Sequence, residues 1–214
     1  MNHTESVRRY IRNLQGKILD VAFVYDRDFS HIEKRTFLKI LKRLEEDGAL
    51  SSISKGVYYV GSLNGVDVNT AVRDYYVGSL DGMMVGDELY RELGVSDHEA
   101  KFHHGYTNKV ANGKNKNVGG FVFAGADLLY TPEVRELIKL LELIEKRRDI
   151  VDLDIQKYAE VRTQLLKGYS DTALTTILKS IPYQVGTIAV LAESLGATGK
   201  YNQAMEIYER VTKE

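Results

Sequence analysis

The sequence predicts a mixed α+β protein, because its composition changes in character near residue 125. Of the 18 glycines, 14 lie before residue 126, and all six phenylalanines lie there too, among short apolar stretches. Such a composition is typical of strands and turns. The rest of the chain holds both prolines and long segments with apolar residues at helical spacing. We therefore expect sheets in the first part of the chain and helices in the second.

Length and composition place the chain among ordinary globular proteins. Its 214 residues suffice for one or two domains, with two slightly favoured, and 43% of them are hydrophobic. The absence of cysteine excludes disulfides, thiolate zinc sites and cysteine nucleophiles. The N-terminal residues lack the apolar stretch of a secretory signal, and no apolar run approaches the roughly 18 residues of a membrane span. We expect a cytoplasmic protein with no membrane partner.

The first third of the chain begins with short elements whose ends are marked by glycine and aspartate. Apolar residues at helical spacing predict a helix over residues 6–14, which Gly16 ends. Residues 16–19 suit a short strand. Asp20 can then cap a short helix over residues 21–24, because its carboxylate can accept from the first free N–H groups of that helix.

The clearest helix of this region follows a turn over residues 25–29. Ser30 and Glu33 have the spacing of a capping box, and Phe29 is placed as a hydrophobic staple. Gly48 ends the helix. One face of it is apolar and is formed by Phe37, Ile40, Leu41 and Leu44. We expect this face to be buried and the opposite, polar face to be exposed.

A glycine-containing turn joins two short strands after this helix. The strands are predicted over residues 49–53 and 57–60, with Ser54-Lys55-Gly56 between them as a hairpin turn. The order helix, strand, helix, turn, helix, hairpin predicts a winged helix-turn-helix over residues 1–61. In such domains the third helix enters the major groove of DNA, and the hairpin tip contacts the backbone beside it.

Basic residues gather on the polar side of the third helix. Residues 1–61 hold 11 Lys+Arg against 8 Asp+Glu, a net charge of +3, whereas residues 62–125 and 126–214 each carry −2. Lysine and arginine would bind phosphates for affinity, and residues near the start of the helix would read bases. The candidate DNA-binding residues are Ser30, His31, Lys34, Arg35, Lys39, Lys42, Arg43 and, at the hairpin tip, Lys55. The alternative is a solvated face whose basic residues pair with acidic neighbours four positions away.

Two segments of this region carry a distinctive combination of residues. Residues 36–48 read Thr-Phe-Leu-Lys-Ile-Leu-Lys-Arg-Leu-Glu-Glu-Asp-Gly, and residues 53–59 read Ile-Ser-Lys-Gly-Val-Tyr-Tyr. This combination resembles the N-terminal winged helix of AbiEi-type antitoxins, which belong to the type IV abortive-infection toxin–antitoxin systems of bacteria. The resemblance continues over residues 84–94 and 106–109, so that it covers roughly residues 6–125 and, more loosely, the tail.

The resemblance implies an antitoxin that also represses its own operon. It implies that the winged helix binds inverted repeats in the promoter. It also implies a cognate nucleotidyltransferase-like toxin, encoded beside it, which the C-terminal part counteracts without forming a stable complex. The residues leave one alternative open, an interaction adaptor whose winged helix docks a protein and whose helical tail is a partner platform. A nucleotidyltransferase-like neighbouring gene would favour the first hypothesis.

Residues 62–130 are predicted to form a small α/β module. Two strands are expected over residues 102–108 and 118–124, joined by a polar hairpin loop over residues 109–117. That loop holds three lysines and no acidic residue. We interpret it as a solvated turn, and a loop that contacts phosphate is the alternative.

The residue patterns that would carry catalysis or metal binding are missing from the sequence. His103 and His104 are neighbours on a predicted strand, so their side chains point to opposite faces and cannot easily bind one metal ion. Residues 113–116 lack the spacing of a P-loop, and neither a nucleophile elbow nor an HExxH motif is present. We therefore expect a protein that is not an enzyme and needs no cofactor or metal.

Residues 131–214 are predicted to form a helical region. Its helices are expected to begin at Thr131-Pro132, Asp154, Asp171 and Pro182. Residues 199–208 resemble the second helix of one tetratricopeptide repeat, but a single copy cannot form a solenoid. We expect that segment to be a terminal helix that packs on the bundle.

Overall fold

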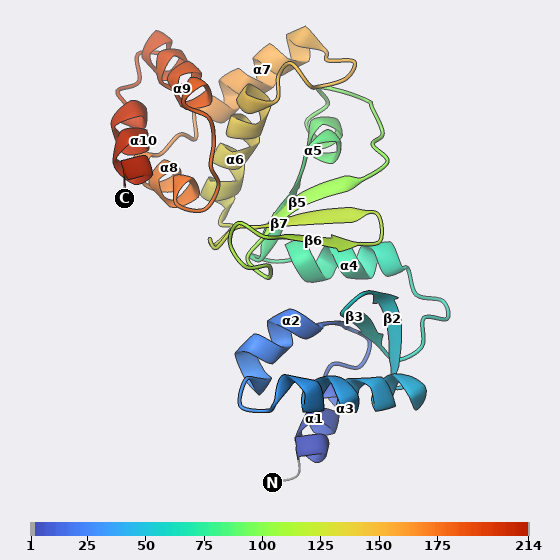
Figure 1. Cartoon of the computed structure of the whole chain (residues 1–214). Coiled ribbons are helices and arrows are strands. Elements are labelled where there is room, and N and C mark those ends of the chain that lie inside the picture. The colour runs from blue at the N-terminus through green and yellow to red at the C-terminus, as the bar shows by residue number, and fades with distance from the viewer. Residues whose placement is uncertain (1–2, 214) are drawn as a thin grey trace. The chain divides into compact units, whose positions relative to one another are not determined.

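The computed structural model describes residues 3–213, and the chain divides into two compact units (Figure 1). The first unit holds the chain up to Tyr76 together with Asn117–Gly120. The second unit holds Val77–Lys116 and the chain from Phe121 onward. Each unit has its own hydrophobic core. The mixed α+β class expected from the composition is confirmed.

The structure contains two compact units, whereas the sequence indicated three regions, 1–61, 62–130 and 131–214. The helix that follows residue 61 belongs to the first unit rather than to a middle module. The remainder of that module, apart from Asn117–Gly120, belongs to the second unit, where Met83 and Leu89 share one core with Leu137 and Leu141 of the helical tail. A helix with a wide apolar stripe must bury it, and the strands and the short helix before it supply the surface.

The first unit combines helices with a small antiparallel sheet. Its elements are α1 (His3–Arg12), β1 (Ile18–Asp20), α2 (Val21–Val24), the π-helix η1 (Tyr25–Phe29), α3 (Lys34–Glu46), β2 (Leu50–Ser54), β3 (Val57–Val60) and, up to Tyr76, α4 (Val68–Val77). β3 lies between β1 and β2 and is antiparallel to both. The short strand before α2 and the hairpin after α3 are thereby confirmed.

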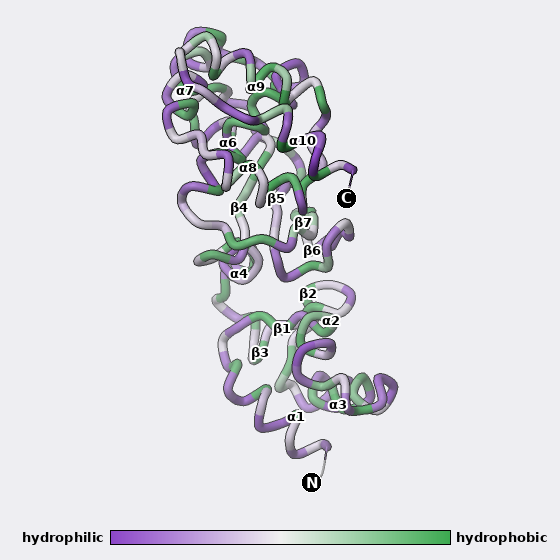
Figure 2. The backbone as a smooth tube through the Cα atoms, turned by 90° about the vertical axis from the view of Figure 1, so that its left-hand side faces the viewer, coloured by the Kyte–Doolittle hydropathy of each residue, from purple (hydrophilic) through white to green (hydrophobic). Residues whose placement is uncertain are grey.

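The core of this unit forms around α3. Figure 2 shows hydrophobic and hydrophilic residues alternating along this helix, as expected for one buried and one exposed face. Val7 and Ile11 of α1 belong to the same core. The residues of α3 that are buried are the four predicted ones, Phe37, Ile40, Leu41 and Leu44.

The start of α3 differs from the prediction. The helix begins at Lys34 with Glu33 in the N-cap position, so the predicted capping box of Ser30 and Glu33 is wrong. The Glu33 carboxylate instead accepts a hydrogen bond from the Thr36 hydroxyl at 3.1 Å. Ser30 lies outside α3 and closes the preceding helix in a right-handed helical conformation.

The segment ahead of α3 is also more helical than expected. Residues 25–29 form the π-helical turn η1 rather than an irregular turn. Phe29 at its end is buried and stacks on Phe37, with ring centroids 5.1 Å apart. The Tyr25 hydroxyl donates to the carbonyl oxygen of Ile32 at 2.8 Å. Because these contacts hold the intervening residues in a turn, α3 begins at Lys34 rather than at Ser30.

The second unit is a mixed sheet followed by helices. Its elements are β4 (Gly82–Val85), α5 (Asp87–Glu92), β5 (His103–Thr107), β6 (Asn115–Val118, of which the last two residues belong to the first unit), β7 (Phe121–Gly125), α6 (Pro132–Glu145), α7 (Ile155–Leu166), α8 (Asp171–Leu178), α9 (Val185–Ala197) and α10 (Ala204–Lys213). The strand order is β4-β5-β7-β6, with β4 and β5 antiparallel and β5 and β7 parallel.

The polar hairpin loop predicted over residues 109–117 is wrong. β5 and β7 are parallel, so the segment between them is a crossover, and it contains the edge strand β6. The turn of two glycines, Gly119 and Gly120, separates β6 from β7 instead. Gly125 at the end of β7 lies so close to the carbonyl oxygen of Ala111 that a Cβ atom would overlap it. A glycine at this position therefore lets the crossover pack against the strand.

The helix starts of the tail match the sequence in part. Thr131 caps α6 and Asp154 caps α7, as predicted. Ser170 caps α8, so Asp171 lies one position inside the helix. α9 begins at Val185 and not at Pro182. The expected terminal helix is α10, which packs on α8 and α9. Over residues 3–213, every helix is too short or too polar to span a bilayer.

Candidate functional site

The exposed face of α3 is basic. A helix turns 100° per residue, so Arg35, Lys39 and Lys42 lie close to the direction opposite the buried face. All three side chains are exposed. They span about two turns of the helix, a length of about 10 Å, and the major groove of DNA, about 12 Å wide, admits an α-helix. The sequence-predicted cations therefore share one continuous surface.

The structure places all eight candidate DNA-binding residues at exposed positions. Ser30 and His31 lie in the turn ahead of α3. Lys55 lies at the tip of the hairpin between β2 and β3, where Gly56 has a φ of +75°. The five on α3 are Lys34, Arg35, Lys39, Lys42 and Arg43. Lys34 and Arg43 lie toward opposite edges of the basic face rather than at its centre.

Nearby carboxylates offset the positive charge of the α3 cations only weakly. Lys42 lies 3.9 Å from Glu46, four residues further along the helix. Exposed pairs of this kind stabilise a helix by about 0.3–0.5 kcal/mol, so a phosphate can displace the carboxylate. Asp47 lies 3.4 Å from Arg8 of α1. Glu46 therefore lies on the basic face at its C-terminal end, paired with Lys42, whereas Asp47 pairs with α1.

The first turn of α3 is less suited to phosphate than its middle. Glu33 occupies the N-cap position, so a carboxylate lies at the end of the helix where free N–H groups would attract an anion. The Lys34 ammonium lies over the ring of Tyr25, 5.3 Å from its centroid. Phosphate contacts are therefore expected from Arg35, Lys39 and Lys42 more than from the start of the helix.

Comparisons with known proteins do not assign the chain to a family. No family model matches it, and no curated protein matches it.

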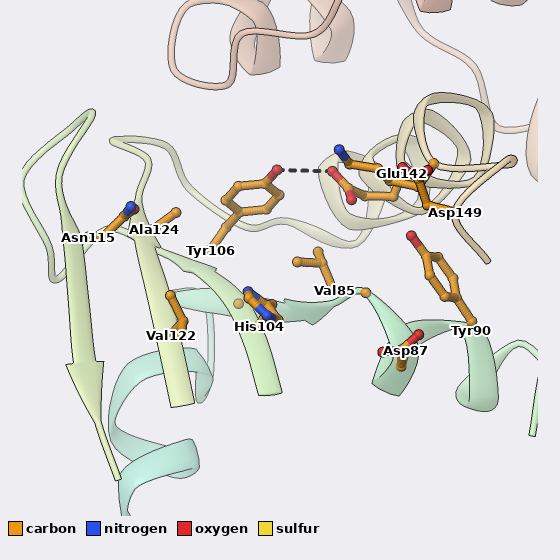
Figure 3. Close-up of a pocket in the computed structure, with 13 residues that line it drawn as sticks. Val85, Asp87, Tyr90, His104, Tyr106, Asn115, Val122, Ala124, Glu142 and Asp149 are labelled. Carbon is orange, nitrogen blue, oxygen red and sulfur yellow. Dashed lines mark hydrogen bonds between the residues drawn. The ribbon is translucent and has the colours of Figure 1, made fainter. Parts of the chain in front are cut away.

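A second surface, which the sequence analysis missed, lies in the second unit. A cavity of about 530 Å³ opens on one face of its sheet, beside α5 and the end of α6 (Figure 3). Figure 3 shows the strand residues His104 and Tyr106 on one side and Tyr90 and Glu142 on the helical side. Such a volume is typical of small-molecule sites.

Glu142 is the buried charged group of this cavity. Its residue is only 4% exposed, and its Oε1 accepts hydrogen bonds from the hydroxyls of Tyr106 at 3.0 Å and Tyr183 at 2.8 Å. Burial raises the pKa of Glu142, and the two tyrosine hydroxyls and Lys146 oppose that rise. A carboxylate between Leu141 and Leu143 in an apolar stripe was the available sequence signal, because buried charges are uncommon.

The two adjacent histidines point to opposite faces of the sheet, as predicted. His103 lies 3.2 Å from the carboxylate of Glu88 and packs beside the ring of Phe121. His104 lines the cavity on the other face. Within residues 3–213, no three potential metal ligands come together. His104 is therefore available as an aromatic wall of the cavity.

Proposed function

We propose that the first unit is a winged helix-turn-helix that binds duplex DNA, and that the chain is an AbiEi-like antitoxin that represses its own operon. The observation that carries the proposal is the exposed basic face of α3, with Lys55 at the tip of the hairpin that follows it. An α-helix fits the major groove, and the hairpin of a winged domain contacts the backbone beside it.

Different residues would supply affinity and specificity. Arg35, Lys39, Lys42 and Lys55 would contact phosphates, which fixes the position of the helix on the duplex. Ser30, His31 and Lys34 precede or begin α3 and would reach base edges. Binding to inverted repeats would place two copies of the chain on one operator, with half-sites about one helical turn apart.

The antitoxin part of the proposal is supported by the resemblance alone. It assigns the helical part of the second unit to the counteraction of a nucleotidyltransferase-like toxin. Co-expression of the full chain with such a toxin, encoded beside it, should restore growth. Failure to restore growth while DNA binding persists would separate the antitoxin role from the repressor role.

One observation favours the adaptor alternative. Leu38 lies between the cations of α3 in sequence and is 45% exposed, so a protein docked on this face would bury it, although a single exposed apolar residue is also ordinary on a protein surface. The two functions differ in their response to salt. Binding to DNA releases counterions and weakens steeply with salt, whereas an interface centred on Leu38 would weaken little.

Fluorescence anisotropy of the full chain on its own upstream DNA tests the DNA-binding proposal. We expect tighter binding to this DNA than to a scrambled duplex, and a steep loss of affinity between about 50 and about 200 mM salt. Lys39→Ala and Lys42→Ala should each weaken both duplexes and reduce the salt slope by about one. Lys179→Ala, an exposed lysine of the second unit, is the matched control and should change neither. Absence of binding at low salt would exclude the proposal.

A further inference from the structure

We propose that the cavity of the second unit binds a small organic cation, an amine or guanidinium joined to an apolar or aromatic body. Glu142 would accept from the cationic group, and the rings of Tyr90, Tyr106 and His104 would contact the body of the ligand. The proposal is independent of the DNA-binding function, because every residue that it uses lies in the second unit.

Glu142 retains acceptor capacity toward the cavity. The hydrogen bonds that it accepts from residues within 3–213 both end on Oε1, and the side chain lines the cavity. An ionised carboxylate offers about four lone-pair positions on its two oxygens. A buried carboxylate that is only partly hydrogen-bonded is costly, so a cationic N–H donor that reaches Oε2 would be strongly favoured.

The lining of the cavity is more anionic than cationic. Its charged residues are the acidic Asp87, Glu142 and Asp149 and the basic Lys146. Burial raises the pKa of Tyr90, and the charges of Glu142, Asp87 and Asp149 raise it further. The three carboxylates therefore create a negative potential around the Tyr90 hydroxyl, which attracts a cation and repels an anion.

Aromatic and apolar groups form the walls. Figure 3 shows the ring of Tyr106 directed toward Glu142, with His104 on the same strand, β5, and Val85 on the neighbouring strand β4. A cation positioned over a tyrosine ring within about 6 Å is attracted by the electrons of its face. The carboxylates and the aromatic lining together match a ligand with one cationic end and one flat or apolar end.

A phosphorylated ligand fits this cavity less well. Lys114 and Lys146 line an adjoining recess of about 240 Å³, but Glu142 and Glu145 line the same recess. Glu142 would face any phosphate held between the two lysines and would repel it. The observations therefore favour an organic cation over a nucleotide, and a nucleotide is the competing outcome of the test.

Calorimetric titration of the full chain with benzamidine, and with its neutral isostere benzamide, tests the proposal. We expect benzamidine to bind and benzamide to bind at least about tenfold more weakly, because hydrogen bonds to a charged group are the stronger kind. Agmatine, an aliphatic guanidinium, should also bind. Equal affinities for the two isosteres, no binding of either cation at millimolar concentration, or tighter binding of AMP would overturn the proposal.

Two variants locate the site. Glu142→Gln preserves the shape of the side chain and removes its charge, so the affinity for benzamidine should fall at least about tenfold. Asp149→Asn, at the exposed end of the cavity, should lower it about two- to threefold and provides the test if Glu142→Gln does not fold. Glu133→Gln, exposed in the first turn of α6, is the control and should bind normally. Unchanged affinity in Asp149→Asn and in a folded Glu142→Gln would place the ligand elsewhere and overturn the proposal.

Discussion

At the scale of single residues, each unit contains a buried carboxylate that accepts a hydrogen bond from tyrosine. Asp20 is 2% exposed and caps α2 as predicted, with its Oδ1 accepting from the backbone N–H of Ala22 at 3.0 Å. Its Oδ2 accepts from the hydroxyl of Tyr76 in α4. Glu142 has the same relation to Tyr106 and Tyr183. Buried charges need such donors, so each hydroxyl ties a distant element to a carboxylate.

Removal of the Tyr76 hydroxyl should destabilise the first unit. Tyr76 is fully buried, and Tyr76→Phe keeps its ring while leaving Asp20 with one donor fewer. We expect a loss of about 1.5–3 kcal/mol in the free energy of unfolding, measured by urea denaturation. Tyr59→Phe, a partly exposed tyrosine of the same unit, should cost no more than about 0.5 kcal/mol. Equal effects of the two substitutions would contradict this account of Asp20.

The stability of the second unit should depend on pH through Glu142. Because burial raises its pKa, the folded state holds the proton more tightly than the unfolded state. This contribution is complete below the unfolded pKa of about 4.3 and is lost as pH rises through the higher folded pKa. Glu142→Gln does not titrate, so its stability relative to the native chain should grow over that window and then level off. Urea denaturation at a series of pH values measures this, and parallel profiles for the two proteins would contradict it.

At the scale of elements, the starts of α6 and α9 are capped in two different ways, one by a neighbour in sequence and the other by a residue from another helix. Thr131 closes α6 locally, through a hydrogen bond from the Val134 N–H. α9 is closed from a distance, because Glu145 of α6 accepts from the Gln184 N–H at 3.3 Å and from the hydroxyl of Thr187. A glutamate in the last turn of a helix is unfavourable for its dipole, so its role at α9 explains its presence.

Loss of this distant cap should cost about as much as loss of a local one. Glu145→Ala is expected to lower the free energy of unfolding by about 0.5–2 kcal/mol, and Thr131→Ala by a similar amount. Glu145→Gln keeps an acceptor oxygen and should recover most of the loss. Thermal or urea denaturation of the three variants measures the effect. Full stability in Glu145→Ala would mean that α9 is closed by another group.

At the scale of the whole molecule, the chain contains two hydrophobic cores, and each core supports a different surface. The core around α3 supports the basic face, and the core of the second unit supports the cavity. Leu41 and Leu141 are equivalent probes, since they are 1% and 0% exposed in the first and the second core. A perturbation of one core should therefore act on one surface first.

Truncation of each leucine should separate the two proposed activities, DNA binding and cation binding. Leu41→Ala and Leu141→Ala are each expected to cost about 2–5 kcal/mol in the unit that contains them. Under conditions that leave the other unit folded, Leu41→Ala should weaken DNA binding and Leu141→Ala should leave it unchanged. Anisotropy and calorimetry on the same samples measure both activities. Equal loss of DNA affinity in the two variants would show that the units do not act separately.

Features that depend on a few neighbouring residues were determined by the sequence itself. The buried face of α3 follows from apolar spacing, the hairpin from its glycine turn, and the starts of α6 and α7 from Thr131 and Asp154. Helix periodicity, caps and turns act within about four residues, so they can be recognised without knowledge of the fold. The same periodicity placed the basic residues of α3 on its exposed face.

Features that depend on residues far apart in the chain were decided only by the tertiary structure. These include the parallel pairing of β5 and β7, the late start of α9, and the grouping of the chain into two units. The cavity belongs to the same class, because Tyr106 and Tyr183 lie 36 and 41 residues from the carboxylate that they contact. Glu142 differs from other charged residues of α6 because it is buried beside the cavity. Its burial depends on which elements pack together, and this is not visible in the local sequence.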